Sequence, residues 1–181
     1  SNVYKFFHGF EIVYRPAYSY KSAEESLREV LEGKTELQDS TILKVMKRNA
    51  WKDMTIVSDF TGSMSPYIGQ LLLWYNLTIG KNKSNIDAFV FFNDGDSKRT
   101  PEKVIGETGG IYHTTETALD SVLYTALHTI EKGGGGDGPE NDIEALVDAQ
   151  KRYKKSKNFV LVADNMAPVR DTALIDKLDA P

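Results

Sequence analysis

The stretch MTIVSDFTGSMS, residues 54–65, joins a short apolar run to a cluster of acid and hydroxyl side chains. Residues 54–58 have the composition of a buried strand. Asp59, Thr61 and Ser63 follow at alternate positions, so in an extended turn their side chains point the same way, and Gly62 permits a tight bend between the hydroxyls. The stretch therefore predicts a strand that ends in a loop carrying three oxygen donors.

Downstream of this stretch, apolar runs alternate with amphipathic segments. The pattern predicts strands at residues 86–92, 107–113 and 158–163, and helices at residues 66–79, 115–131, 139–153 and 168–178. Strands separated by helices of this length indicate an α/β domain, with a mostly parallel central sheet and helices on both faces.

Residues 1–50 do not follow this alternation, and we expect an N-terminal extension that packs on the core formed by residues 51–181. The extension is expected to contain a strand at 10–14, a capped helix from Ser22 to Gly33 and a helix at 36–48. Another strand should follow the helix at 168–178 in an α/β domain, so the domain at 51–181 is expected to be truncated before a final strand.

Composition excludes several classes of partner and site. With 181 residues, a net charge of −4 and no block of like charges, the chain has no electrostatic footprint for nucleic acid or an anionic membrane. Its apolar runs are far shorter than the roughly 20 residues of a membrane span. The lack of cysteine excludes disulfides, thiolate zinc sites and thiol nucleophiles. Localisation stays open, with export or the cell surface favoured over the cytoplasm.

Three loops are expected to meet at the carboxyl edge of the sheet, where open parallel sheets bind ligands. The first carries Asp59, Thr61 and Ser63, the second carries Asp137 behind four glycines, and the third carries Asp164 after the strand at 158–163. Carboxylates and hydroxyls suit a hard divalent cation, whereas zinc prefers the imidazole and thiolate that these loops lack. The sequence therefore predicts one cation, which is Mg²⁺, Mn²⁺ or Ca²⁺.

The first loop also resembles a known metal-binding element. Residues 59–64 (DFTGSM) are similar to the D-x-T-G-S-M form of the D-x-S-x-S motif in the metal-ion-dependent adhesion site (MIDAS) of von Willebrand factor type A (vWA) domains. Residues 135–141 (GGDGPEN) stand where that family supplies a threonine, and Asp164 stands where it has its last aspartate. Order and spacing correspond over about residues 52–178, so the resemblance covers most of the chain.

The resemblance implies a Rossmann-like vWA domain that holds one divalent cation, Mg²⁺ in the first place. Thr61 and Ser63 would contact the metal directly, Asp59 and Asp164 would act mainly through water, and an acidic ligand from a partner would fill an open position. Asp137 departs from the pattern, because a carboxylate in place of threonine adds negative charge beside the cation. The metal should then be held more tightly and should attract an acidic partner less strongly.

Each candidate residue also has a structural interpretation. The pattern at 59–63 makes turns and helix caps, Asp137 could favour the dipole of the following helix without metal, and Asp164 could begin a turn. Residues 93–97 (NDGDS) resemble a calcium loop but lack its glutamate at the twelfth position, so we expect a solvated turn there. The glycines at 133–136 lack the Lys-Ser/Thr pair of a phosphate-binding loop.

These observations lead to a functional hypothesis of a non-enzymatic binding module. Its cation would bridge the domain to a protein or other ligand that carries an acidic or other oxygen donor. The alternative is a metal-dependent hydrolase or phosphotransferase that uses the same cation. The three loops contain no basic residue placed to clamp a phosphate and no general base apart from the proposed ligands, which favours binding. A third interpretation keeps the fold without metal, as a structural element of a larger assembly.

Overall fold

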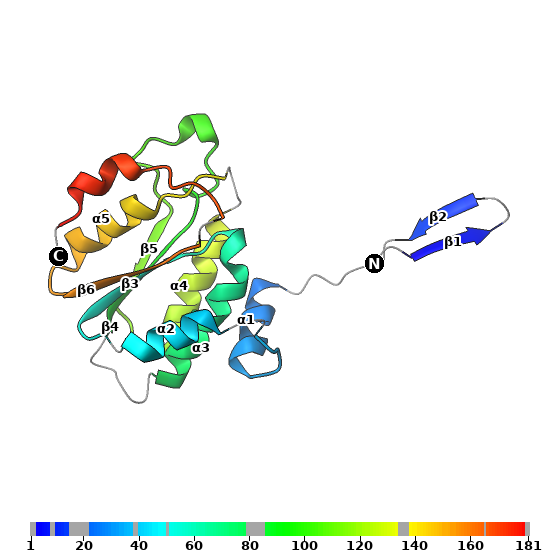
Figure 1. Cartoon of the computed structure of the whole chain (residues 1–181), viewed down its shortest axis with the longest axis horizontal. Helices are drawn as coiled ribbons and strands as arrows, with labels where there is room; N and C mark the ends of the chain where they lie inside the picture. Colours follow the sequence, from blue (N-terminus) through cyan, green and yellow to red (C-terminus); the bar gives the residue numbers. More distant parts are fainter. Residues whose placement is uncertain are drawn as a thin grey trace.

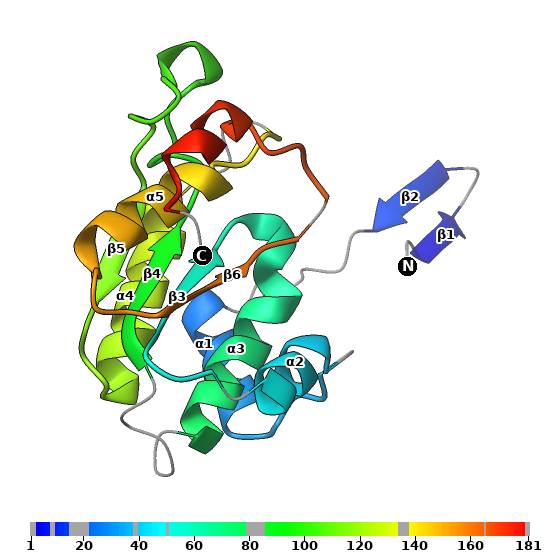
Figure 2. The ribbon, with the colours of Figure 1, turned by 60° about the vertical axis from the view of Figure 1, so that its left-hand side comes forward.

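The central sheet has four strands in the order β5-β4-β3-β6, drawn in Figures 1 and 2. Its bounds are β3 (Met54–Asp59), β4 (Ile86–Phe92), β5 (Ile111–Thr114) and β6 (Asn158–Val162). β3 pairs in parallel with both β4 and β6, and β5 pairs antiparallel with β4. These coordinates are a computed structural model, which describes residues 3–7, 10–14, 22–37, 40–49, 51–78, 86–133, 138–164 and 166–179.

Alternate side chains of the two central strands supply two separate cores. Every residue of β3 is buried, as expected for a strand covered on both faces. Ile56 of β3 and Phe89 and Phe91 of β4 belong to one apolar cluster, while Val57 and Val90 belong to a second cluster on the opposite face. The sheet is therefore the middle layer of three.

Helices cover both faces, which confirms the predicted α/β architecture. α3 (Ser65–Thr78) and α4 (Leu119–Lys132) supply the first cluster, and α5 (Asp142–Arg152) supplies the second. In Figure 2, α5 lies on one side of the sheet and α3 on the other. The arrangement is Rossmann-like. In the described part of the chain, no helix is both long enough and apolar enough to cross a bilayer.

The described N-terminal residues form a β-hairpin and two helices. β1 (Val3–Phe7) and β2 (Phe10–Tyr14) make an antiparallel hairpin that is separate from the central sheet, and only the second of these strands was predicted. α1 (Ala23–Leu31) begins with the predicted capping box, in which Ser22 and Glu25 exchange hydrogen bonds of 3.1 and 3.0 Å. α2 (Thr41–Asn49) begins five residues later than the helix predicted at 36–48.

Leu27 of α1 and Met46 of α2 are buried in the first apolar cluster, against which Ile42 and Leu43 of α2 also pack. Both helices contact α3. The helices of the extension thus share a core with the sheet.

Three boundaries predicted near the carboxyl edge are wrong. α5 begins at Asp142 and not at Pro139, because the backbone of Glu140 forms a parallel bridge with Val169 instead of a helical turn. The helix predicted at 168–178 is the short 3₁₀ segment η3 (Thr172–Lys177). The strand predicted at 107–113 is reduced to β5, since Gly109 and Gly110 have φ of 79° and 72°, which lie outside the extended region.

Candidate metal centre

An aspartate lies at or just beyond the carboxyl end of each of the three parallel strands. Asp59 is the last residue of β3, Asp94 lies two residues beyond β4, and Asp164 lies two residues beyond β6. Because β4, β3 and β6 are neighbours in the sheet, these ends lie side by side. Glu140 and Asp142 reach the same edge from the start of α5, and burial and mutual charge couple Asp59, Glu140, Asp142 and Asp164 electrostatically.

The first loop brings its three predicted donors together. The backbone N–H of Thr61 donates to Oδ1 of Asp59 over 2.7 Å, and the hydroxyls of Thr61 and Ser63 are 3.2 Å apart. Residues 62–64 form a single 3₁₀ turn, η1 (Gly62–Met64), so the hydroxyls converge through a turn and not through an extended segment. Gly62 has no unusual φ, and an added Cβ would meet nothing within 4 Å. The bend therefore does not depend on a conformation that only glycine adopts.

The third loop is held against the segment that precedes α5. Oδ1 of Asp164 accepts a hydrogen bond of 2.8 Å from the backbone N–H of Met166. Further along, the N–H of Glu140 donates to the carbonyl of Pro168 over 3.0 Å, and the N–H of Arg170 donates to the carbonyl of Glu140 over 2.7 Å. These two backbone bonds keep the loop after β6 beside Glu140.

The predicted ligand Asp137 lies outside the described residues, and its role stays a prediction. The carboxylate that the structure brings to the edge from this loop is Glu140, three residues later, with only 7% of its surface exposed. Sequence reasoning missed it because Pro139 was read as the start of a helix, which would carry Glu140 away on the first turn. The adjacent Asn141 is also buried, and its side-chain amide has no partner within the described parts of the chain.

Asp94 was also missed, because residues 93–97 were expected to form a solvated turn. Asp96 and Ser97 are exposed as expected, but Asn93 and Asp94 are buried, with 1% and 4% of their surfaces exposed. Oδ1 of Asn93 accepts from the backbone N–H groups of Gly95 and Asp96, both over 2.9 Å, and its Nδ2 donates to the carbonyl of Thr129 over 3.0 Å. The bond to Thr129 fastens the loop to α4. The position of Asp94 directly after a buried strand, like that of Asp59, was the signal that could have found it.

Burial and mutual repulsion raise the pKa of the clustered acids. Desolvation raises the pKa of Asp59 to about 6, opposed by hydrogen bonds from Thr61 and reinforced by the charges of Asp142 and Asp164. Desolvation and the charges of Asp171 and Asp164 likewise raise the pKa of Asp142 to about 6.

Glu140 is the most strongly shifted of these groups. Desolvation, followed by a hydrogen bond with the carboxyl of Asp94 and the charges of its acidic neighbours, raises its pKa to about 9. Without a cation, burial and these neighbouring charges favour the neutral form of the Glu140 carboxyl. Repulsion of this kind indicates that the cluster lacks a positive charge to neutralise its carboxylates.

Two other buried acids nearby differ from these because the backbone satisfies them. Glu144 accepts three hydrogen bonds, from the N–H groups of Gly106 (3.1 Å), Thr108 (3.2 Å) and Gly109 (3.1 Å). Asp171 accepts from the N–H groups of Ile143 (3.3 Å) and Glu144 (2.5 Å) in the first turn of α5, where helix N–H groups lack intrahelical partners. These two carboxylates therefore have a structural role, because their hydrogen bonds stabilise the fold.

The candidate ligands, in contrast, carry oxygens that nothing in the described residues satisfies. One carboxylate oxygen of each of five acids is buried without a hydrogen-bond partner: Asp59 Oδ2, Asp94 Oδ1, Glu140 Oε2, Asp142 Oδ1 and Asp164 Oδ2. Buried charges are normally paired or coordinate metals. Within the described ranges, no group of three or more His, Asp or Glu side chains forms a ready-made metal cluster, and the candidate donors here combine carboxylates with hydroxyls. The donor chemistry fits Mg²⁺, Mn²⁺ or Ca²⁺.

Comparison of the chain with protein-family models, with curated proteins and with solved structures found no match.

Proposed function

We propose that this chain is a binding module that depends on a divalent cation. Asp59, Thr61, Ser63 and Asp164 would hold one ion, Mg²⁺ in the first place, and Glu140 would join them from the loop that also contains Asp137. The ion would then accept an oxygen donor, such as a carboxylate, from a protein partner. We also propose that the domain is of the vWA type, with a variant MIDAS-like site.

One observation carries the proposal: the five orphaned carboxylate oxygens at the carboxyl ends of the parallel strands and at the start of α5. Glu144 and Asp171 lie within the same fold and have backbone partners, so burial of an acid does not by itself leave an oxygen orphaned in this protein. A cation would satisfy the oxygens and offset the repulsion among the acids, which is the physical role of a metal in such a cluster.

The bound cation would supply an electrophilic position for a ligand oxygen. The chain's own residues would orient that position: the Thr61 N–H restrains Asp59, and the bridge between Glu140 and Val169 restrains the loop opposite. The hydroxyls of Thr61 and Ser63 are neutral donors, so they add ligands without adding negative charge. A site of this kind keeps more attraction for an acidic partner than a site made of carboxylates alone.

The test is thermal unfolding of the full chain with MgCl₂, MnCl₂ or CaCl₂ and with EDTA. Because a ligand that binds only the folded state stabilises it, each metal that binds is expected to raise the melting temperature. Asp59→Ala should remove the shift, and Asp176→Ala, which changes an exposed acid on η3, should keep it. Equal melting curves with metal and EDTA would refute the proposal. Turnover of a generic phosphoester that is lost in Asp59→Ala would favour the hydrolase or phosphotransferase alternative instead.

A further inference from the structure

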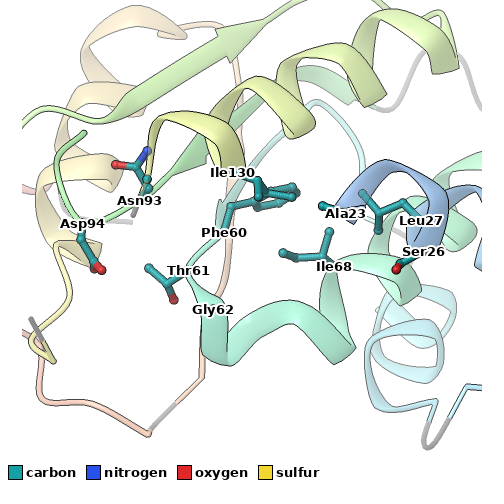
Figure 3. A pocket seen from close by; sticks show the side chains of 11 residues that line it. Ala23, Ser26, Leu27, Phe60, Thr61, Gly62, Ile68, Asn93, Asp94 and Ile130 are labelled. Atoms are coloured by element: carbon teal, nitrogen blue, oxygen red, sulfur yellow. The ribbon is translucent and has the colours of Figure 1, made fainter. Parts of the chain in front are cut away.

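A pocket of about 430 Å³ adjoins the candidate metal centre, and two residues belong to both the pocket lining and the metal centre. At one end lie Thr61, a proposed ligand, and Asp94, one of the clustered acids. At the other end lie residues of α1 and α3, with Phe60 and Ile130 between the two ends, as Figure 3 shows. The pocket is thus polar beside the metal centre and apolar away from it.

The apolar end is built by the core and by the N-terminal extension together. Phe60, Ile68 and Leu27 line it and are 3%, 3% and 6% exposed, so their positions are fixed by packing. Ala23 and Ser26 of α1 also line the pocket, and both are exposed, so they form its open rim. A chain lying across the start of α1 can therefore place a side chain inside.

The volume and the charge pattern of the pocket indicate which kind of ligand it can hold. About 430 Å³ lies within the range of roughly 300–1,000 Å³ that is typical of ligand pockets, so one large apolar side chain fits with its adjoining backbone. A cation held by Thr61 and its neighbours would attract a carboxylate at the polar end. Thr61 belongs to both sites, so the two groups of the ligand must be close together in its chain.

We propose that the pocket is a specificity subsite for a protein partner in which an aspartate or glutamate stands directly beside a large apolar residue. The carboxylate binds the cation, and the apolar side chain enters between Phe60, Ile68 and Leu27. This inference rests on the proposed function, because it needs the cation to hold the carboxylate. The pocket would select among partner segments by the residue beside the carboxylate, whereas the cation alone binds any accessible carboxylate.

The experiment measures binding of blocked peptides to the full chain by calorimetry in MgCl₂ and in EDTA. The peptides are Gly-Gly-Glu-Phe-Gly, the same peptide with Ala in place of Phe, and the same peptide with Gln in place of Glu. We expect the Phe peptide to bind at least about tenfold more tightly than the Ala peptide, since a large apolar side chain is removed from water. The Gln peptide should not bind, and no peptide should bind in EDTA.

A filling variant tests the pocket itself. Ser26→Trp places a large ring at the rim and should lower the affinity for the Phe peptide to that for the Ala peptide. Lys44→Trp, on the exposed side of α2 and outside the pocket, should change neither affinity. Both variants should keep the shift in melting temperature caused by Mg²⁺, which shows that they fold and bind the ion.

The outcomes separate the two proposals. If Mg²⁺ raises the melting temperature and Glu is required, but the Phe and Ala peptides bind equally or Ser26→Trp has no effect, the subsite is refuted and the cation-dependent module stands. If Mg²⁺ has no effect on melting and the Gln peptide binds as well as the Glu peptide, the module itself fails. If hexanoate binds as tightly as the Phe peptide, the pocket takes free apolar acids, and its assignment to a protein segment is overturned.

Discussion

Thr61 donates its backbone N–H to Oδ1 of Asp59 over 2.7 Å, while Oδ2 of the same carboxylate is buried without a hydrogen-bond partner among the described residues. One oxygen is therefore restrained by the loop, and the other is left to a group that the described chain does not supply. Asp59 is fully buried, so this imbalance costs free energy unless a proton or a cation offsets it.

Replacing Asp59 with asparagine should raise the melting temperature in EDTA, because the side chain keeps its shape and loses its buried charge. The expected rise is about 2–6 °C, since 1 kcal/mol corresponds to about 2–4 °C for a domain of this size. The same variant should lose the stabilisation by Mg²⁺. Differential scanning calorimetry with and without metal measures both effects. Asp176→Asn, an exposed control, should change neither, and a lower melting temperature for Asp59→Asn in EDTA would contradict the idea of an uncompensated charge.

The free energy of unfolding in EDTA should fall as the pH rises from about 4 to 9. Burial raises the pKa of Asp59 and Asp142 from 3.8 to about 6 and that of Glu140 from 4.5 to about 9, so the folded state binds more protons than the unfolded state in this range. Stability decreases with pH wherever the folded state binds more protons. The decline should be steepest between pH 4 and 6, where Asp59, Asp142 and Glu140 all keep protons in the folded state that they lose in the unfolded state, and should continue more slowly to pH 9 through Glu140 alone.

The same protons compete with the cation for these oxygens, so stabilisation by Mg²⁺ should be larger at pH 8 than at pH 5. Urea denaturation at each pH, in EDTA and in saturating MgCl₂, provides both curves. An Mg²⁺ effect of equal size at the two pH values would show that the titrating acids do not take part in metal binding.

Glu140 and Glu144 should respond in opposite ways to substitution by glutamine. Glu144→Gln turns one acceptor into a donor that faces backbone N–H groups and should lower the free energy of unfolding by about 2–4 kcal/mol. Glu140→Gln replaces a carboxyl whose charged form is repelled by its neighbours with a neutral amide, so it should leave stability in EDTA unchanged or raised while it weakens Mg²⁺ binding. Chemical denaturation and metal titration of the pair check this contrast, and equal destabilisation by both changes would disprove the distinction between them.

Gly110 should be far less tolerant of alanine than Gly62. The φ of Gly110 is 72°, and a Cβ there would lie 2.1 Å from Oδ1 of Asn93, the atom that organises the turn containing Asp94. Gly110→Ala should therefore cost about 2 kcal/mol or more in the free energy of unfolding, measured in urea. Gly62→Ala meets nothing within 4 Å and should stay within about 0.5 kcal/mol of the parent. Similar losses in both variants would contradict this account.

The sequence by itself determined most of the strands and helices. β4 has its predicted bounds, and the bounds of α3 and α4 lie within one and four residues of the predicted ones, because hydrophobic periodicity and capping act over a few neighbouring residues. It also predicted that hydroxyls would gather after β3, and the 3.2 Å contact between Thr61 and Ser63 agrees with that expectation. All of these features depend on interactions that are local along the chain.

Only the tertiary structure decided which other acids join Asp59 at the carboxyl edge. An aspartate in a turn has the same local pattern whether water or protein covers it, so the sequence predicts a solvated Asp94, although a hydrogen bond from Asn93 holds the start of the loop against α4 and Asp94 is buried. Glu140 was predicted in the first turn of a helix, but its backbone forms a bridge with Val169, 29 residues away in the chain. Hydrophobic periodicity describes neighbouring residues and cannot predict such a contact. Desolvation and charge coupling depend on what packs around a carboxylate, and that is a property of the folded chain.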